Sequence, residues 1–230
     1  VSPALVTRTT SINPNNPNEI GFDQFNNPTD VWEYDFGQGG PGQLLRHTRT
    51  DYLTINPVNG IDYTTNGVHN GRLPAGTKVY GYKNGQEVLL SRNEVKYDET
   101  PLEPRSNVVG WTDPQTSARG LVTTSKTWIN TTDASVDQNS PQAYIQTQAK
   151  YDVLGNVVEI TDGQEIKSYI YYDDNFGFAD NEARQNNPPS QLNGLSTFAF
   201  ASKATNDLGH TVFTQFNYFT GATVNAEDAN

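Results

Sequence analysis

Residues 151–162 read Tyr151-Asp152-Val153-Leu154-Gly155-Asn156-Val157-Val158-Glu159-Ile160-Thr161-Asp162. An aromatic residue before an aspartate ends a strand, and the aspartate side chain can accept hydrogen bonds from backbone amides two residues further on. Gly155 then supplies the positive φ that a tight turn needs, and the following residues return to the two-residue alternation of a strand. The stretch therefore predicts a hairpin corner with Tyr151 and Ile160 on the packed face.

The same pattern recurs in weaker form along the chain. The copies are Asn206-Asp207-Leu208-Gly209-His210-Thr211-Val212 and Phe22-Asp23-Gln24-Phe25-Asn26-Asn27-Pro28-Thr29, where Asn26 stands in place of the glycine. Gly209 and Gly221 enclose a further alternating run. One hairpin cannot bury its own face, so neighbouring units have to pack side by side. The sequence therefore predicts a repeat protein.

The pattern Tyr-Asp-x-x-Gly-Asn-x-x-x-x-x-Asp resembles the YD repeat of the RHS family, a group of large bacterial surface and toxin-associated proteins. The resemblance implies an all-β fold in which antiparallel strand-turn-strand repeats form a curved, twisted sheet, part of a YD-repeat spiral. It covers residues 151–162 and 202–228 well, and residues 21–52 more loosely. The positions that carry it are Tyr151, Asp152, Gly155, Asn156, Asp162, Asp207, Gly209 and Gly221.

Residues 1–230 are predicted to form a single YD/RHS-repeat region, with irregular insertions near residues 131–142 and 173–193. The chain contains no methionine. Its last residues, 227–230, stop where such an array would continue with another strand. We therefore expect a fragment of a longer array.

Alternation and turn residues place the strands. The predicted strands are residues 4–10, 30–36, 43–55, 77–82, 86–97, 121–129, 143–152, 157–161, 165–172, 196–205, 211–218 and 222–227. Asn84-Gly85 lies between two alternating runs and predicts a two-residue type I′ hairpin turn. The glycine-rich residues 37–42 look superficially like a phosphate-binding loop. No helical pattern begins there, so we interpret them as a hairpin loop.

Composition excludes several classes of protein. The formal net charge is −11, and the 15 Lys and Arg are scattered along the sequence, which argues against nucleic-acid binding. Without cysteine there are no thiol nucleophiles, disulfides or Cys-ligated metals. No apolar run is long enough to span a membrane. Hydrophobic residues make up only 34% of the chain, but it has 12 Tyr, so large amphipathic rings carry much of the burial.

Candidate catalytic and metal sites are weak. The three histidines, His47, His69 and His210, lie in separate repeats without the spacing of a metal site or a catalytic triad. The densest set of oxygen ligands is Asp173, Asn175, Asp180 and Glu182. It resembles a calcium loop in part but lacks the bidentate glutamate at the twelfth position, so a solvated loop without metal is expected. We predict no cofactor.

Three further motifs carry possible functions. Trp32, Trp111 and Trp128 could stack on sugars, although aromatic residues in a thin sheet are also needed as core. Asn130-Thr131-Thr132 is a glycosylation sequon. Longer RHS proteins release a toxin by self-cleavage at an Asp-Pro-x-Gly segment. Residues 111–116 contain Asp113-Pro114 without the glycine, so autoproteolysis is not carried over.

The expected function is that of a non-enzymatic extracellular structural module, a wall segment of an RHS/YD-repeat shell or bacterial surface assembly. The alternatives are a self-assembling extracellular fibre subunit and a carbohydrate-binding surface module; an enzyme would need a cleft that the sequence does not reveal. Residues 4–10 and 222–227 are predicted to be unguarded edge strands. Their expected partners are the rest of the array or identical copies. The expected location is secreted or on the cell surface.

Overall fold

The computed structural model describes residues 4–65, 69–115, 118–129, 140–176 and 189–228. The protein is all-β, as predicted. Twelve strands follow one another in chain order in an antiparallel sheet, and two short 3₁₀ helices lie at Pro141–Ala143 and Ser190–Leu192. The strands are β1 (Leu5–Thr10), β2 (Asp30–Gln38), β3 (Leu44–Leu53), β4 (Leu73–Lys83), β5 (Gln86–Tyr97), β6 (Val122–Trp128), β7 (Tyr144–Tyr151), β8 (Val157–Thr161), β9 (Lys167–Tyr171), β10 (Lys203–Asn206), β11 (Thr211–Phe216) and β12 (Thr223–Glu227).

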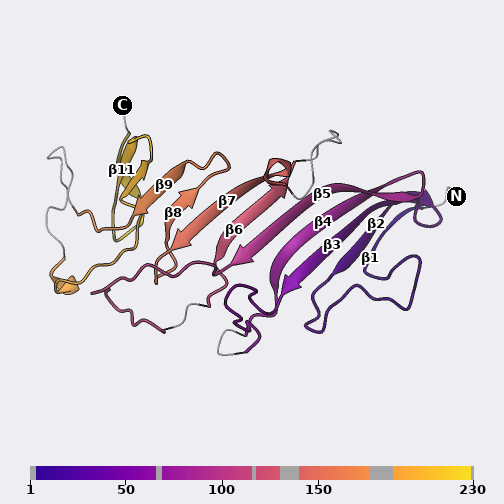
Figure 1. The fold of residues 1–230 in the computed structure, drawn as a ribbon, viewed down its shortest axis with the longest axis horizontal. Helices are drawn as coiled ribbons and strands as arrows, with labels where there is room; N and C mark the ends of the chain where they lie inside the picture. The colour runs from indigo at the N-terminus through magenta and orange to yellow at the C-terminus, as the bar shows by residue number, and fades with distance from the viewer. Residues whose placement is uncertain (1–3, 66–68, 116–117, 130–139, 177–188, 229–230) are drawn as a thin grey trace. The chain divides into compact units, whose positions relative to one another are not determined.

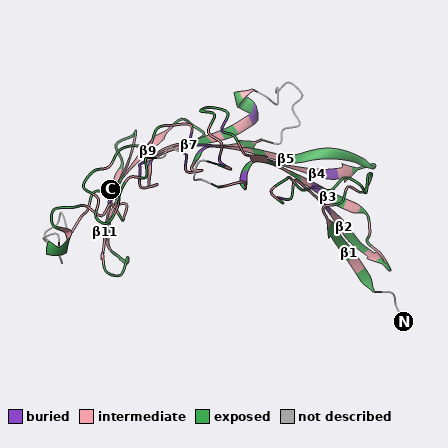
Figure 2. Ribbon diagram, turned by 90° about the horizontal axis from the view of Figure 1, so that it is seen from below, coloured by how far each residue is buried: buried purple, intermediate pink, exposed green. Residues whose placement is uncertain are grey.

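The chain divides into two compact units. The first unit comprises Val1–Glu99 and Ala118–Gln146, and the second comprises Thr100–Ser117 and Thr147–Asn230. In the first unit β1 to β5 lie side by side in chain order (Figure 1). Most residues of each unit are exposed or half-buried (Figure 2). No helix of the described residues is long and apolar enough to span a membrane.

The predicted hairpins of the first unit are present. Asn84 and Gly85 have φ of 54° and 75°, which are the two positive values that a type I′ turn requires. This turn joins β4 and β5 and pairs Lys83 with Gln86. The glycine-rich loop follows β2 and leads into β3, which pair antiparallel, so the hairpin interpretation is confirmed.

The core of the first unit lies where β3, β4 and β5 meet their loops. The buried cluster consists of Tyr63, Leu73, Tyr97 and Ala118, with Leu53, Ile61 and Val95 packed against it. Beside it Asp98 is buried. One of its carboxylate oxygens accepts hydrogen bonds from the Tyr63 hydroxyl at 2.8 Å and from the Gly120 backbone N–H at 2.7 Å. A buried carboxylate must be satisfied in this way, so Asp98 fixes the loops to the strand ends.

The corner at Asp152 has the predicted geometry. Asp152 Oδ1 accepts hydrogen bonds from the backbone N–H groups of Leu154 at 3.0 Å and Asn156 at 2.9 Å. The Asp152 N–H donates to the Asn156 carbonyl, and the Gly155 N–H donates to the Asp152 carbonyl, both at 2.9 Å. Gly155 has φ of 89°. The side chain thus supplies the acceptors that a sharp reversal of the backbone otherwise leaves unmade.

The same four bonds recur at three other corners. They begin at Asp23, Asp162 and Asn206, and the residues with positive φ are Asn26, Glu165 and Gly209. In the last copy Asn206 takes the role of Asp152, while Asp207 accepts a hydrogen bond from the Lys167 N–H at 3.1 Å. Counting back three residues from Gly209 gives Asn206, so Asn206 and not Asp207 is the first residue of this corner.

Burial at the Asp152 corner differs in detail from the prediction. Tyr151 and Ile160 are half-buried, whereas Asp152, Val153 and Val158 are buried. Asp152 is in contact with a distant part of the chain, because the Arg105 guanidinium pairs with its carboxylate at 3.0 Å. The carboxylate of the turn is therefore itself an interior group of the second unit.

The predicted strand over residues 196–205 is mostly absent. Only Lys203–Asn206 is extended as β10. Upstream, Phe198 has φ of 47°, and the Thr197 N–H donates to the Asp174 carboxylate at 2.6 Å instead of to a neighbouring strand. A side-chain acceptor and one left-handed residue are enough to break the ladder.

We predict that Gly155→Val lowers the free energy of unfolding by roughly 1–3 kcal/mol, because a β-branched residue is strained at positive φ. A Cβ atom added to Gly155 would have no heavy atom within 4 Å, so the loss is backbone strain rather than a clash. The matched control is Gly155→Asn, since Asn26 adopts φ of 63° at the equivalent position. Urea unfolding should show a clear loss for Val and a small one for Asn; equal stabilities for all three proteins would contradict the turn assignment.

Candidate functional site

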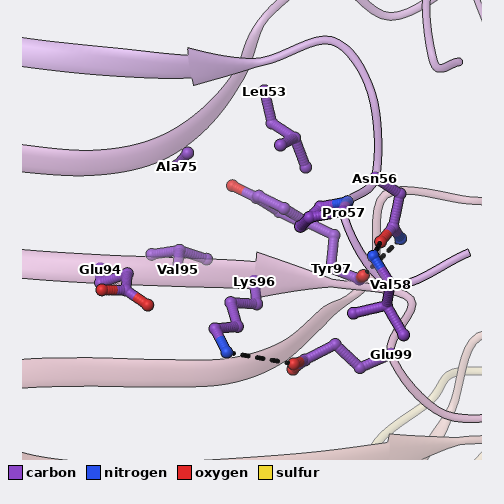
Figure 3. Close-up of a pocket in the computed structure, with 10 residues that line it drawn as sticks. All are labelled: Leu53, Asn56, Pro57, Val58, Ala75, Glu94, Val95, Lys96, Tyr97 and Glu99. Carbon is purple, nitrogen blue, oxygen red and sulfur yellow. Dashed lines mark hydrogen bonds and ion pairs between the residues drawn. The ribbon is translucent and has the colours of Figure 1, made fainter. Parts of the chain in front are cut away.

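An apolar pocket of about 190 Å³ opens in the first unit at the ends of β3, β4 and β5. Its walls are Leu53, Pro57, Val58, Ala75, Val95 and Tyr97, and Asn56, Glu94, Lys96 and Glu99 complete the lining (Figure 3). For scale, a dry cavity of about 150 Å³ can hold a benzene ring. The space therefore suits one small apolar or aromatic group.

Asn56 positions one wall of the pocket. Its side chain is buried, and Nδ2 donates to the Tyr63 hydroxyl and to the Tyr97 carbonyl, each at 2.9 Å. These bonds hold the loop that carries Pro57 and Val58 beside Tyr97 (Figure 3). The Asn56 Oδ1 also accepts from the Val58 N–H at 2.9 Å, so the loop is fixed by one residue.

Tyr97 forms the other fixed wall. Its hydroxyl donates to the Pro74 carbonyl at 2.7 Å, and burial raises the pKa of the phenol above its usual range. A phenol that stays protonated and is already donating is a poor candidate for a general base. Tyr97 therefore acts here as an apolar surface.

Two of the charged groups of the rim, Lys96 and Glu99, are paired with protein groups. Glu99 accepts hydrogen bonds from the hydroxyls of Thr123 at 2.9 Å and Thr124 at 2.5 Å. Lys96 Nζ lies 3.6 Å from Glu99, as Figure 3 shows. The lining contains no serine, cysteine or histidine, which are common nucleophiles and bases. The pocket can bind an apolar group, but its described lining provides no acid–base pair of the usual kind.

His47 lies at the centre of a second polar cluster, on β3. Its ring stacks on Trp32 at 4.6 Å and on Tyr80 at 5.6 Å between ring centroids. Nε2 is 2.9 Å from Asp30 Oδ1, and Nδ1 is 2.9 Å from Glu87 Oε1. A neutral imidazole has one N–H and one acceptor nitrogen. Both contacts are therefore hydrogen bonds only when both nitrogens carry a proton.

This arrangement makes His47 a cross-strand clamp. It links side chains of β2, β3 and β5, and the Tyr82 hydroxyl of β4 also donates to Glu87, at 2.7 Å. Desolvation and the Glu87 carboxylate raise the pKa of Tyr82 well above its ordinary value. The side chain of His47 has 9% of its surface exposed, so the cluster stabilises strand register and offers little room for a substrate.

The three tryptophans lie in different surroundings. Trp32 is buried in the His47 stack, which leaves little of its ring for a sugar. Trp128 has the Arg92 guanidinium 4.0 Å above its ring and Tyr144 tilted against it at 5.2 Å. Trp111 is half-buried. Trp32 and Trp128 lie on β2 and β6, which are not neighbouring strands of the sheet, so these two rings do not form one platform.

The calcium candidate is only partly within the described residues. Asp180, Glu182 and the sequon residue Asn130 lie outside them. Asp173 is exposed, and the Asn175 N–H donates to the Tyr218 hydroxyl at 3.0 Å. Across the described ranges no group of three or more His, Cys, Asp or Glu side chains could hold a metal ion.

The histidines also separate. His69 is exposed with φ of 48°. His210 is exposed, and its N–H donates to Asn206 Oδ1 at 3.0 Å, so it is a turn residue. Sequence reasoning missed the apolar pocket and the surroundings of His47. Alternation marks the inward residues of one strand, but pairing them with residues of another strand requires the register.

The chain matches no protein-family model and no curated protein sequence.

We predict that EDTA leaves the melting temperature nearly unchanged, because the loop that contains Asp173 and Asn175 is expected to be stable without metal. Differential scanning calorimetry of the untreated and EDTA-treated protein tests this, with added Mg²⁺ as the control for ionic effects. A fall of many degrees that calcium alone reverses would show a calcium site.

We predict that His47→Phe lowers the free energy of unfolding by about 1–3 kcal/mol, because the ring stack is kept while Asp30 and Glu87 lose a hydrogen-bond donor. Tyr80→Phe, which keeps the ring in the same stack, is the control and should be nearly neutral. In the His47→Phe background, Asp30→Asn should cost less than it does in the original chain, as a double-mutant cycle in urea would measure. Additive effects would contradict the clamp.

Proposed function

We propose that this chain is a non-enzymatic structural repeat module, a wall segment of an extracellular assembly of the RHS/YD-repeat type. The observation that carries the proposal is the strand order. Among the described residues, every internal strand has a neighbour on each side, whereas β1 and β12 each pair with one strand only. A sheet that ends in open strands has backbone N–H and C=O groups available for another polypeptide.

The repeated corner supports the repeat interpretation. Four corners share the same backbone and side-chain hydrogen bonds although their sequences differ, with Asp or Asn at the first position. A unit that needs only one Asx residue and one residue with positive φ can be repeated many times with little sequence constraint. This matches what the resemblance to YD repeats implies.

Hydrogen bonding of several carboxylates supports the non-enzymatic part of the proposal. The carboxylates of Asp98, Asp152 and Glu99 all accept hydrogen bonds from protein groups, and the lining of the apolar pocket contains no serine, cysteine or histidine. Such groups stabilise loops and corners.

The two edge strands are similar in regularity. In β1, Thr7 is skipped between Val6 and Arg8, and Arg8, Thr9 and Thr10 pair with consecutive residues of β2. In β12, Val224 is skipped between Thr223 and Asn225, and residues 225–227 pair with consecutive residues of β11. The Arg8 guanidinium lies 5.9 Å from the Tyr34 ring centroid, on a face of the sheet and not in line with its edge.

The extracellular bacterial location belongs to the same proposal. An acidic chain without cysteine is compatible with it, and the resemblance to the RHS family is what favours it. The partner is either the continuing array or a second copy of this chain. These two partners predict different behaviour for the isolated chain.

The test is sedimentation velocity of the 230-residue chain over a range of concentrations. We expect association that Val6→Lys weakens, because an inward-facing lysine guards an edge strand. The matched control is Val88→Lys, which adds the same charge to β5, an internal strand where Val88 is exposed; it should leave association unchanged.

A chain that remains monomeric at all concentrations, and that also fails to pair with an added peptide of an adjoining repeat, would refute the proposal. Association of the chain alone, abolished by Val6→Lys, would favour a fibre of identical copies. Pairing with the added repeat peptide in preference to itself would favour the wall segment.

A further inference from the structure

A row of basic side chains crosses three adjacent strands of the first unit. Arg49 of β3 pairs with Lys78 of β4, and Lys78 pairs with Arg92 of β5. Directly paired residues of antiparallel strands lie on the same face of the sheet. Neighbouring strands are about 4.8 Å apart, so the three cations form one continuous row.

This row is unexpected from the charge of the chain. The protein has a net charge of −11 and only 15 Lys and Arg, yet three of these residues are paired directly with one another. Within the described part of the chain, none of the three has an acid within ion-pair distance. Like charges placed directly opposite each other destabilise a sheet. Asp30 of β2 is paired directly with Arg49 and offsets this at one end of the row, but Lys78 lies between two cations.

Aromatic residues fix one end of the row. The Arg92 guanidinium lies 4.0 Å from the Trp128 ring centroid, and Lys126 Nζ lies 4.7 Å from the Tyr144 ring centroid. An arginine stacked on an aromatic ring is held in place while the N–H groups in its plane remain directed outward. Such a guanidinium is preorganised for a bidentate contact with a carboxylate.

A second row on the same face consists of two acidic residues and a glycine. Asp51, Gly76 and Glu94 pair across the same three strands, two residues further along each strand. Because Gly76 has no side chain, the surface is hollow there. A depression of about 110 Å³ is lined by Asp51, Ala75, Gly76, Thr77, Lys78, Arg92, Asn93 and Glu94. Cationic donors and carboxylate acceptors therefore meet in one place.

We propose that this face binds an acidic oligosaccharide, with the uronate carboxylates on Lys78 and Arg92 and the sugar hydroxyls on Asp51 and Glu94. A sugar ring carries both an anion and several hydroxyl donors, and it is comparable in length to the distance between strands. A nucleic acid also carries repeated charges, one at every phosphate, so it is the competing class of ligand. The proposal stands on this surface alone and does not depend on pairing of the sheet edges.

The experiment is isothermal titration calorimetry with an oligogalacturonate and with the same oligomer as its methyl ester, which keeps the rings and removes the charges. We expect binding of the acid form that weakens with added salt, and much weaker binding of the ester. Lys78→Gln should weaken binding roughly tenfold, as expected for loss of one charged hydrogen bond. Its melting temperature should not fall, because a repulsive contact is removed.

The matched control is Arg46→Gln. Arg46 is on the same strand as Arg49, β3, but its position alternates to the other face, where it pairs with Glu33; its loss should leave binding unchanged. Equal binding of acid and ester, equal effects of the Lys78 and Arg46 variants, or the absence of binding to the oligogalacturonate would overturn the proposal. Tighter binding of a single-stranded oligodeoxynucleotide than of the oligogalacturonate would also overturn it.

Discussion

Hydrogen bonds that the backbone N–H groups two and four residues further on donate to one Asp or Asn side chain make this architecture possible. A chain whose strands pair only with their neighbours has to reverse direction after each strand, and each reversal leaves backbone groups without ladder partners. At Asp152 and Asn206 the side-chain oxygen accepts two of those N–H groups. Register in the flanking strands follows from this local closure.

Burial in this protein is limited, and polar interactions are correspondingly prominent in the interior. The small cluster around Tyr63 and Tyr97 is the apolar core of the first unit, but buried Asp98, Asn56 and His47 lie close to or between its elements. Each of these polar groups is satisfied by hydrogen bonds. Removing one partner of a buried pair costs more than the pair contributes, so such networks favour a single arrangement of loops and strands.

The same register that satisfies the His47 cluster also creates the basic row. His47 and Arg49 alternate along β3 on one face, and their partners Tyr80 and Lys78 do the same on β4. One row is closed by aromatic stacking and carboxylates, whereas in the next Arg49 is exposed and Lys78 and Arg92 are half-buried. A structural row and a candidate binding row can therefore lie on a single face of a thin sheet, because each strand contributes a side chain to both.

Local sequence was enough to predict the all-β class, the hairpin at Asn84-Gly85 and the corner at Asp152, because turn chemistry acts between residues that are close in the chain. It also predicted most strand positions, and it failed at residues 196–205, where the distant Asp174 carboxylate captures the Thr197 N–H. Which side chains meet across strands became known only from the folded chain. Bulges between Asp51 and Tyr52 and between Val79 and Tyr80 shift the pairing, and alternation within one strand does not reveal such shifts. The basic row is one example. Its residues Arg49, Lys78 and Arg92 are far apart in the sequence, and the register of three strands brings them to one face.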